Sequence, residues 1–278
     1  MTNYPYALDG KILSIKDVHL SFGKKVILRG VNGQIDNIVR PDMQQGQVVA
    51  LLGPSGIGKT QLFRIIAGLE VPDGTISGSV TIGIEDTPVE PGFVGVVAQN
   101  YPLFRNRTVR GNLLVAGKRT KLTKKEVAEK ADSLLGEFDL TDRGPLYPKQ
   151  LSGGQRQRLA IAQQLMCSEH LVLMDEPFSG LDPLMVDRVS GLIQKISTMD
   201  EYNTIILVTH DIGSAICNAD TIWVMGRDVD ENGNIIPGAY IKHTIDLIGE
   251  GLAWRPDIRK EERYREIANE LRDLFPTL

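Results

Sequence analysis

The stretch that decides the fold is Val48-Val49-Ala50-Leu51-Leu52-Gly53-Pro54-Ser55-Gly56-Ile57-Gly58-Lys59-Thr60. It opens with five consecutive apolar residues, which are typical of a β-strand covered on both faces. A glycine-rich turn follows that fits the pattern G-x-x-x-x-G-K-[ST], and a helical pattern continues over residues 59–69. A buried strand, this turn and a helix in that order predict a loop whose backbone N–H groups converge on the phosphates of a nucleotide.

The residues of this loop suit a nucleotide together with a magnesium ion. The ammonium group of Lys59 can reach the β- and γ-phosphates as a compact charge. The Thr60 hydroxyl suits Mg²⁺, a hard cation that prefers oxygen ligands. The predicted nucleotide-binding residues of the loop are Gly53, Pro54, Ser55, Gly56, Ile57, Gly58, Lys59, Thr60 and Gln61.

Beyond the loop, apolar runs alternate with helical patterns. Further buried strands are predicted at residues 93–98, 171–174, 205–208 and 221–225. A helical stripe with a spacing of three and four residues lies within 189–196. Strands that alternate with helices predict an α/β fold with a largely parallel sheet.

The N-terminal part of the chain has a different pattern. Val18, Leu20 and Phe22 alternate with polar residues, which predicts a half-buried strand, and residues 26–28 are its expected hairpin partner. The polar stretch 32–47 that follows is predicted to be a loop.

Two segments lie outside the alternation of strands and helices. Residues 100–150 contain no convincing strand, and Thr123 with Glu126 forms a possible capping box in front of an apolar helical stripe. A mostly helical subdomain, at about residues 100–158, is therefore expected as an insertion. The stripe of the C-terminal helix, over residues 264–275, fits either packing on its own domain or a contact with a partner.

Polar residues follow three of the predicted strands at the edge where open α/β sheets bind ligands. Asp175 is placed to hold Mg²⁺ through water, and Glu176 could orient or deprotonate an attacking water. His210 follows the strand 205–208 through Thr209, and Gln99 follows the strand 93–98. A histidine or glutamine at such a place is equally compatible with a structural role, and sequence spacing does not join either one to the site.

Composition excludes several classes of protein. With 278 residues, 42% apolar and 24% charged, the chain is too apolar for wholesale disorder. A formal charge of -4 excludes bulk attraction to nucleic acid or anionic lipid as the organising principle. Cys167 and Cys217 lack metal-type spacing and are expected to be free thiols in a reducing compartment. Neither a membrane-spanning run nor a signal peptide is recognised, so the sequence predicts a cytosolic protein.

A second glycine-rich segment, Leu151-Ser152-Gly153-Gly154-Gln155, directly precedes a helical stretch and predicts a second anion site at a helix N-terminus. The order of these motifs, from Ile12 to Met225, resembles the ATP-binding cassette (ABC) ATPases. The resemblance includes Asp175-Glu176-Pro177 and Ser179-Gly180-Leu181-Asp182. It implies an α/β P-loop NTPase (RecA-like) core with an antiparallel β subdomain and an inserted α-helical subdomain. The expected division is an ABC ATPase domain at 11–243 and a C-terminal extension at 244–278.

The resemblance also assigns roles to residues. It implies two cassettes packed head to tail, with ATP between the phosphate loop of one and the signature segment of the other. Glu176 is then the general base, His210 contacts the γ-phosphate, and Lys59 completes the catalytic set. Mg²⁺ is held by Thr60, Gln99 and Asp175. The other nucleotide contacts that the resemblance implies are Phe22 on the adenine and Ser152, Gly153, Gly154, Gln155 and Asp182 from across the dimer.

This sequence departs from the family pattern in two places. The stretch 32–47 looks several residues longer than usual, which leaves Tyr4 and Tyr6 as alternatives to Phe22 for stacking on adenine. Gln61 stands where a second hydroxyl residue commonly follows Thr60, although its backbone N–H can still meet the α-phosphate. Residues 101–104 and 108–110 resemble importer-type cassettes, in which they line the groove for a coupling helix of the membrane subunit.

The expected function is that of the ATP-hydrolysing, energy-coupling subunit of a membrane transporter, most simply an importer. ATP and Mg²⁺ are the implied cofactors, and nucleic acid is not an expected partner. The implied partners are an integral membrane subunit, a second ATPase subunit in a homodimer and, where the transporter uses one, an extracytoplasmic substrate-binding protein. The chain is then peripheral to the cytoplasmic face of the inner membrane. The rival hypotheses are a soluble ABC ATPase of DNA repair or translation and a P-loop kinase of small molecules.

Overall fold

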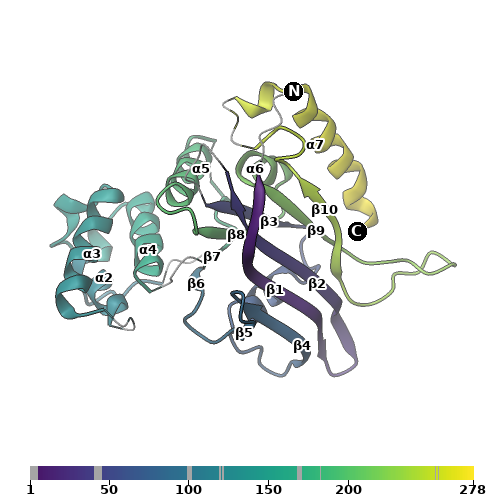
Figure 1. The fold of residues 1–278 in the computed structure, drawn as a ribbon, viewed down its shortest axis with the longest axis horizontal. Helices are drawn as coiled ribbons and strands as arrows, with labels where there is room; N and C mark the ends of the chain where they lie inside the picture. The colour runs from purple at the N-terminus through teal and green to yellow at the C-terminus, as the bar shows by residue number, and fades with distance from the viewer. Residues whose placement is uncertain are drawn as a thin grey trace.

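The computed structural model describes residues 6–40, 46–98, 102–118, 120, 122–167, 171–181, 183–253, 255 and 257–278 (Figure 1). Within these residues the strands form a six-stranded sheet of order β10-β9-β3-β8-β7-β6 and a four-stranded sheet of order β2-β1-β4-β5. Three helices, α2, α3 and α4, form an arm at the left of Figure 1, and α7 lies at the opposite side. The predicted α/β core, antiparallel β subdomain and helical insertion are all present.

The six-stranded sheet is parallel except at one edge, where β10 runs antiparallel to β9. Its central strands are buried on both faces, which explains why they read as continuous apolar runs in the sequence. All five predicted core strands are confirmed, although β6 is shorter than the run that predicted it. The strands are β3 (Gln47–Leu52), β6 (Gly95–Val97), β7 (Leu171–Asp175), β8 (Thr204–Thr209), β9 (Thr221–Gly226) and β10 (Tyr240–Asp246).

Three helices are interleaved with these strands. The helix predicted after the phosphate loop is confirmed as α1, and the stripe at 189–196 lies on α5, where Val189, Ile193 and Ile196 are buried. A short helix, α6, follows β8 and begins two residues after His210. The bounds are α1 (Lys59–Ile66), α5 (Pro183–Ser197) and α6 (Ile212–Asn218).

The four-stranded sheet corrects one prediction. The hairpin of β1 with β2 is confirmed, but β2 continues to Val39, so residues 32–39 are strand and not the predicted loop. The strand was not recognised in the sequence because Gly33 takes the inward position between the buried Val31 and Ile35, where an apolar side chain would be expected. A Cβ there would lie 3.0 Å from Ile241 and 3.1 Å from the Trp223 ring, so the space is filled from two other strands. The strands are β1 (Ala7–Phe22), β2 (Lys25–Val39), β4 (Thr75–Ile82) and β5 (Thr87–Pro88).

The helical arm follows the predicted pattern closely. Thr123 and Glu126 form the expected capping box at the start of α3. The stripe behind this box is buried between α2 and α4, and it consists of Val127, Ala131, Leu134, Leu135 and Phe138. The elements are α2 (Val109–Gly117), α3 (Lys124–Glu137), η1 (Thr141–Arg143), η2 (Pro148–Gln150) and α4 (Gly153–Cys167).

The C-terminal helix packs on its own domain, which decides between the two predicted alternatives for its stripe. Ile267, Ala268 and Leu271 of α7 are each 1% exposed and share a core cluster with Ala215 and Ile216 of α6. Neither Cys167 nor Cys217 forms a disulfide. In the described part of the chain, no helix combines the length and apolarity needed to traverse a bilayer. The C-terminal elements are η3 (Ile258–Lys260), α7 (Glu262–Leu274) and η4 (Phe275–Thr277).

Candidate functional site

The phosphate loop lies between the end of β3 and the start of α1, as the sequence predicts. Gly56 and Gly58 have φ values of 79° and 117°, a left-handed backbone that favours glycine. A Cβ at Gly58 would also lie 3.1 Å from a Leu28 methyl group of the β1–β2 hairpin. Gly58 is the N-cap of α1 and no side chain caps this helix end, so the first turn can offer its N–H groups and its dipole to an anion.

Lys59 is folded back into this loop. Its side chain is buried, and Nζ donates to the carbonyl oxygens of Gly53 at 2.7 Å and Pro54 at 3.1 Å. Nζ also lies 4.0 Å from Oε1 of Glu176. Burial lowers the pKa of the Lys59 ammonium group, while the negative charges of Glu176 and Asp175 oppose that shift. The structure therefore places a buried cation beside the two predicted carboxylates.

Asp175 ends β7 and has the properties of a cation ligand. Its Oδ1 atom is buried and has no hydrogen-bond partner among the described residues. Burial raises the pKa of this carboxyl, the charge of Glu176 raises it further, and Lys59 opposes the shift. Because a buried, unpartnered carboxylate oxygen is costly without a compensating charge, Asp175 fits the Mg²⁺ expected here. The exposed Thr60 hydroxyl, one residue after Lys59, can supply a second oxygen.

Glu176 joins β7 to the residues that follow β8. Its φ is 48°, and its backbone N–H donates to the Val208 carbonyl oxygen at 2.9 Å. Its Oε1 lies 2.9 Å from Nδ1 of His210, and its Oε2 lies 3.5 Å from the Thr209 hydroxyl. The structure thus joins His210 to the site, which the sequence spacing did not. This arrangement suits a base held in place by its neighbours.

Two residues beside His210 that the sequence motifs do not mark support the imidazole. The Thr209 hydroxyl accepts a hydrogen bond from the Asp211 backbone N–H at 3.1 Å, and Asp211 caps α6 by accepting from Ser214 N–H at 2.6 Å. Asp211, with Ser214 three residues later, is a recognisable helix start, and it could have shown that a helix begins directly after His210.

The signature segment lies on the helical arm, at the exposed start of α4. Ser152 Oγ accepts from Gln155 N–H at 3.3 Å, and Gln155 Oε1 accepts from Ser152 N–H at 2.9 Å. These two residues therefore form a capping box at the helix start. A Cβ at Gly154 would be 3.4 Å from the terminal methyl of Met185 on α5. The side-chain hydrogen bonds of Ser152 and Gln155 stay within the segment, so it does not reach the phosphate loop of the same chain through them.

Phe22 lies at the end of the hairpin nearest to the phosphate loop. Its ring is half-buried against the core of the β subdomain, and the neighbouring Ile27 and Leu28 approach Gly58. Tyr6 lies at the other end of β1 and donates its hydroxyl to Asp246 Oδ2 at 2.9 Å, so it is not the alternative stacking residue. Tyr4, Gln99 and Asp182 lie outside the described residues.

A protein family described as "ABC transporter" matches residues 37–179. This chain belongs to the ABC transporter family. The match covers the phosphate loop, the signature segment and the Asp175-Glu176 pair in one continuous region.

Relatives of known name support this assignment. The sulfate/thiosulfate import ATP-binding protein CysA 2 of Shewanella oneidensis is 41% identical over 223 residues, which is 77% of this chain and 59% of that protein. CysA of Pseudomonas syringae is 42% identical over 202 residues, 70% of this chain and 61% of that protein. CysA of Mesostigma viride is 36% identical over 248 residues, 88% of this chain and 69% of that protein. The ABC chain thus spans about three fifths of the length of the first two of these relatives.

A solved structure resembles this ABC chain over most of its length. The cbiO1 protein of Clostridium perfringens, described as part of the ABC transporter complex cbiONQ, matches with a TM-score of 0.68 and 25% sequence identity. The match covers 95% of this chain and 100% of that chain. The core, the β subdomain and the helical arm therefore form an ABC ATPase fold.

Proposed function

We propose that this chain is the ATP-binding and ATP-hydrolysing subunit of an ABC membrane transporter. The observation that carries the proposal is the continuous set of contacts from the phosphate loop through Lys59 and Glu176 to His210. Sequence spacing alone does not produce this set, because it requires β7 and β8 to be neighbours in the sheet. It brings together a phosphate-binding cation, a carboxylate base and an imidazole at one sheet edge.

In the proposed reaction, each residue acts on the γ-phosphate or on the attacking water. Lys59 and the N–H groups at the start of α1 hold the β- and γ-phosphates. Glu176 accepts a proton from water as the water oxygen attacks the γ-phosphorus and the bond to ADP breaks. His210 holds the Glu176 carboxylate and can contact the γ-phosphate. Thr60, Asp175 and Gln99 are proposed to hold Mg²⁺, which when bound neutralises charge on the phosphates.

The second half of the nucleotide site is proposed to come from another copy of this chain. Ser152, Gly153, Gly154 and Gln155 would contact the γ-phosphate, with Asp182 crossing the same interface. Support for this comes from the position of the signature segment on the helical arm, where it is exposed and makes its own capping box. Once the γ-phosphate is removed, the remaining nucleotide binds the closed dimer less tightly than ATP does, so the dimer is expected to open.

Transport is proposed to be import, with ATP hydrolysis coupled to a membrane subunit. The named relatives are import ATP-binding proteins for sulfate or thiosulfate, which supports this direction. Phe104 is 43% exposed and lies in the segment expected to line the groove for a coupling helix. The chain would be peripheral to the cytoplasmic face of the inner membrane, and an extracytoplasmic binding protein would select the substrate. We retain residues 11–243 as the cassette and 244–278 as the extension.

The test is to purify the chain from detergent-solubilised native membranes and to measure Mg²⁺-dependent ATP hydrolysis. We expect a multispanning membrane protein to co-purify and Glu176→Gln to abolish hydrolysis in the complex. A chain that stays free of membrane proteins and hydrolyses ATP only when DNA or ribosomes are added would overturn the transport proposal in favour of the soluble alternative.

A further inference from the structure

The C-terminal extension is packed onto the helix that follows His210. The buried face of α7 shares a core with Ala215 and Ile216 of α6. Only Asp211 separates α6 from His210, and Asp211 caps α6 through Ser214 N–H. A change in the position of α6 therefore acts directly on the backbone that carries His210.

Tyr264 makes the contact at the first turn of α6. Its hydroxyl lies 3.4 Å from the position that a Cβ at Gly213 would take, so the phenol sits close against backbone. The ring is half-buried, and burial followed by the neighbouring Cys217 raises the pKa of the phenol. Because position 213 has no side chain, the hydroxyl can approach this turn, where the Asp211 Oδ1 atom lies 3.7 Å from the same Cβ position.

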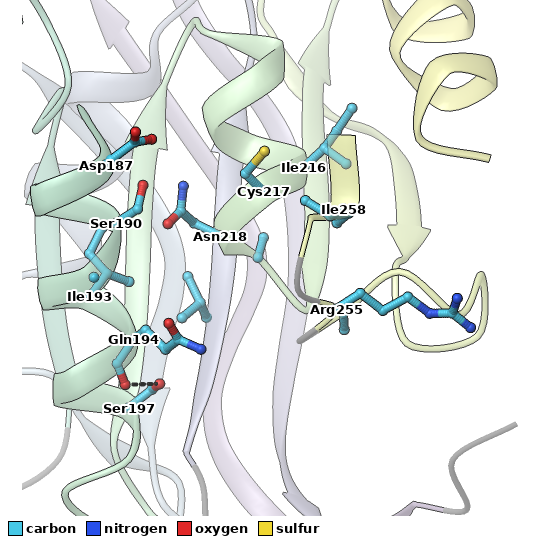
Figure 2. A pocket seen from close by; sticks show the side chains of 14 residues that line it. Asp187, Ser190, Ile193, Gln194, Ser197, Ile216, Cys217, Asn218, Arg255 and Ile258 are labelled. Carbon is cyan, nitrogen blue, oxygen red and sulfur yellow. Dashed lines mark hydrogen bonds between the residues drawn. The ribbon is translucent and has the colours of Figure 1, made fainter. Parts of the chain in front are cut away.

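Two cavities border α6, one at each end of the helix. A cavity of about 500 Å³ is lined by Glu176, His210, Gly213, Arg259 and Tyr264 among others, so the extension and the catalytic pair share its wall. A second cavity, of about 410 Å³, lies between α5, α6 and the side chains of Ala253, Arg255 and Ile258. Cys217 lines this space, and Figure 2 shows Asn218 of α6 directed toward Ser190 of α5. The C-terminal end of α6 thus borders a cavity. We therefore expect the contact with Tyr264 to supply a larger share of the packing that fixes the first turn.

We propose that Tyr264 is a positioning residue for hydrolysis: by packing against Gly213 it fixes the first turn of α6 and so holds the His210 imidazole on Glu176. This inference rests on the proposed ATPase function. The pair lies at 2.9 Å, and hydrogen bonds weaken beyond about 3.2 Å, so a displacement of roughly half an ångström would weaken it. A tyrosine in the extension thereby acts on the reaction without touching the nucleotide.

The primary test compares Tyr264→Ala with Tyr264→Phe. Because misplaced catalytic groups act at a distance, we expect Tyr264→Ala to lower kcat about tenfold while KM for ATP stays within about twofold. Tyr264→Phe keeps the ring but removes the hydroxyl that lies against Gly213, so it should lower kcat by a smaller factor than Tyr264→Ala. The matched control is Arg265→Ala, since Arg265 is the next residue on α7 and is exposed. Thermal unfolding of each variant checks that the fraction folded at the assay temperature is unchanged.

A second readout does not depend on activity. The imidazole signals of His210 in nitrogen-15 NMR spectra, identified with His210→Gln, should move in Tyr264→Ala, move less in Tyr264→Phe and stay in place in Arg265→Ala. If Tyr264→Ala does not fold, Gly213→Val tests the same contact from the other side, because its branches would push Tyr264 away. It should shift the same signals and lower kcat.

The outcomes separate the two proposals. A parent without ATPase activity contradicts the proposed function, while the NMR comparison still tests whether Tyr264 positions His210. A parent that hydrolyses ATP, with unchanged His210 signals and unchanged kcat in both Tyr264→Ala and Gly213→Val, overturns the positioning role. Equal losses in kcat for Tyr264→Ala and Arg265→Ala would also overturn it.

Discussion

The phosphate loop and the signature segment are both glycine-rich turns that open a helix, yet they are built differently. No side chain caps α1, and a buried lysine within the loop binds its carbonyl oxygens. The start of α4 is capped by its own Ser152 and Gln155, and it is exposed on the helical arm. The first helix start offers its N–H groups without a side-chain cap, whereas at the second the N–H groups of Ser152 and Gln155 already donate to side-chain oxygens.

This difference bears on the proposed dimer, in which two anion sites serve one nucleotide. The uncapped loop is expected to bind ATP alone, because its backbone donors have no side-chain cap and Lys59 has only to leave the carbonyl oxygens of Gly53 and Pro54 to reach the phosphates. In the proposed dimer the capped segment is presented by the partner chain, so its contribution should appear only on closure. ATP binding and dimer closure are therefore expected to be separable by mutation.

The largest expected effect is that of Glu176→Gln on turnover. General-base catalysis contributes about 10²- to 10⁴-fold, so kcat should fall by about 10³-fold, while ATP affinity stays within twofold. Because hydrolysis can no longer remove the γ-phosphate, ATP should trap a dimer that size-exclusion chromatography detects. Hydrolysis at the parent rate would show that Glu176 is not the base.

Lys59→Ala should act on the uncapped loop alone. Loss of a buried cation from the phosphate site should weaken ATP binding by about 100-fold, or about 2.7 kcal/mol. Titration with a fluorescent ATP analogue measures this, and Lys125→Ala on the exposed face of α3 is the control. An unchanged affinity for ATP would show that Lys59 does not bind the phosphates.

Ser152→Ala should act on the capped segment alone. It should cost about 1 kcal/mol of stability as a lost N-cap. Turnover should also fall, by about tenfold if the lost phosphate contact is worth about 1.4 kcal/mol. ATP binding to the isolated chain should be unchanged. Thr123→Ala is a matched control because it removes the same kind of capping box from α3, outside the nucleotide site. Equal loss of turnover in the two variants would reduce the role of Ser152 to helix capping.

The smallest expected effect is a gain in stability from Asp175→Asn. The pKa of Asp175 is raised in the folded protein, so the fold binds this proton more tightly than the unfolded chain does. The charged carboxylate therefore costs stability near neutral pH without Mg²⁺, and this cost disappears as pH falls below the ordinary value for aspartate. Asp175→Asn should raise Tm at pH 7 by about 3 °C, and the gain should vanish near pH 3. A lower Tm at pH 7 would contradict this, and exposed Asp142→Asn is the control.

Much of the core could be predicted from sequence because its strands are covered on both faces. Residues 48–52 and 205–208 are continuous apolar runs, and the structure buries them completely. Strands that are partly exposed to solvent are harder to recognise, because their sequences lack a continuous apolar run. Several residues of β4 and β10 are exposed, and neither strand was predicted. In β2, Gly33 interrupts the alternation, because Ile241 of β10 and Trp223 of β9 fill the place of its side chain.

The members of the site could be predicted, but not all of their contacts. Motif spacing identifies Lys59, Asp175 and Glu176 together. His210 is 34 residues from Glu176, and only the register of β7 with β8, which pairs Asp175 with Val208, brings the two side chains to 2.9 Å. The contact between Tyr264 and Gly213 likewise depends on how α7 packs, which no local pattern encodes.

The backbone at Glu176 suggests a way to find such sites in other proteins. Six non-glycine residues in the described part of the chain have a positive φ, and the five others are aspartates: Asp17, Asp73, Asp86, Asp139 and Asp257. Aspartate tolerates this conformation because its short side chain can bond to nearby backbone. Glutamate has no such advantage, so its presence reflects a demand on the side chain. A glutamate with a left-handed backbone directly after a buried parallel strand is thus a criterion by which uncharacterised structures can be searched for water-activating carboxylates.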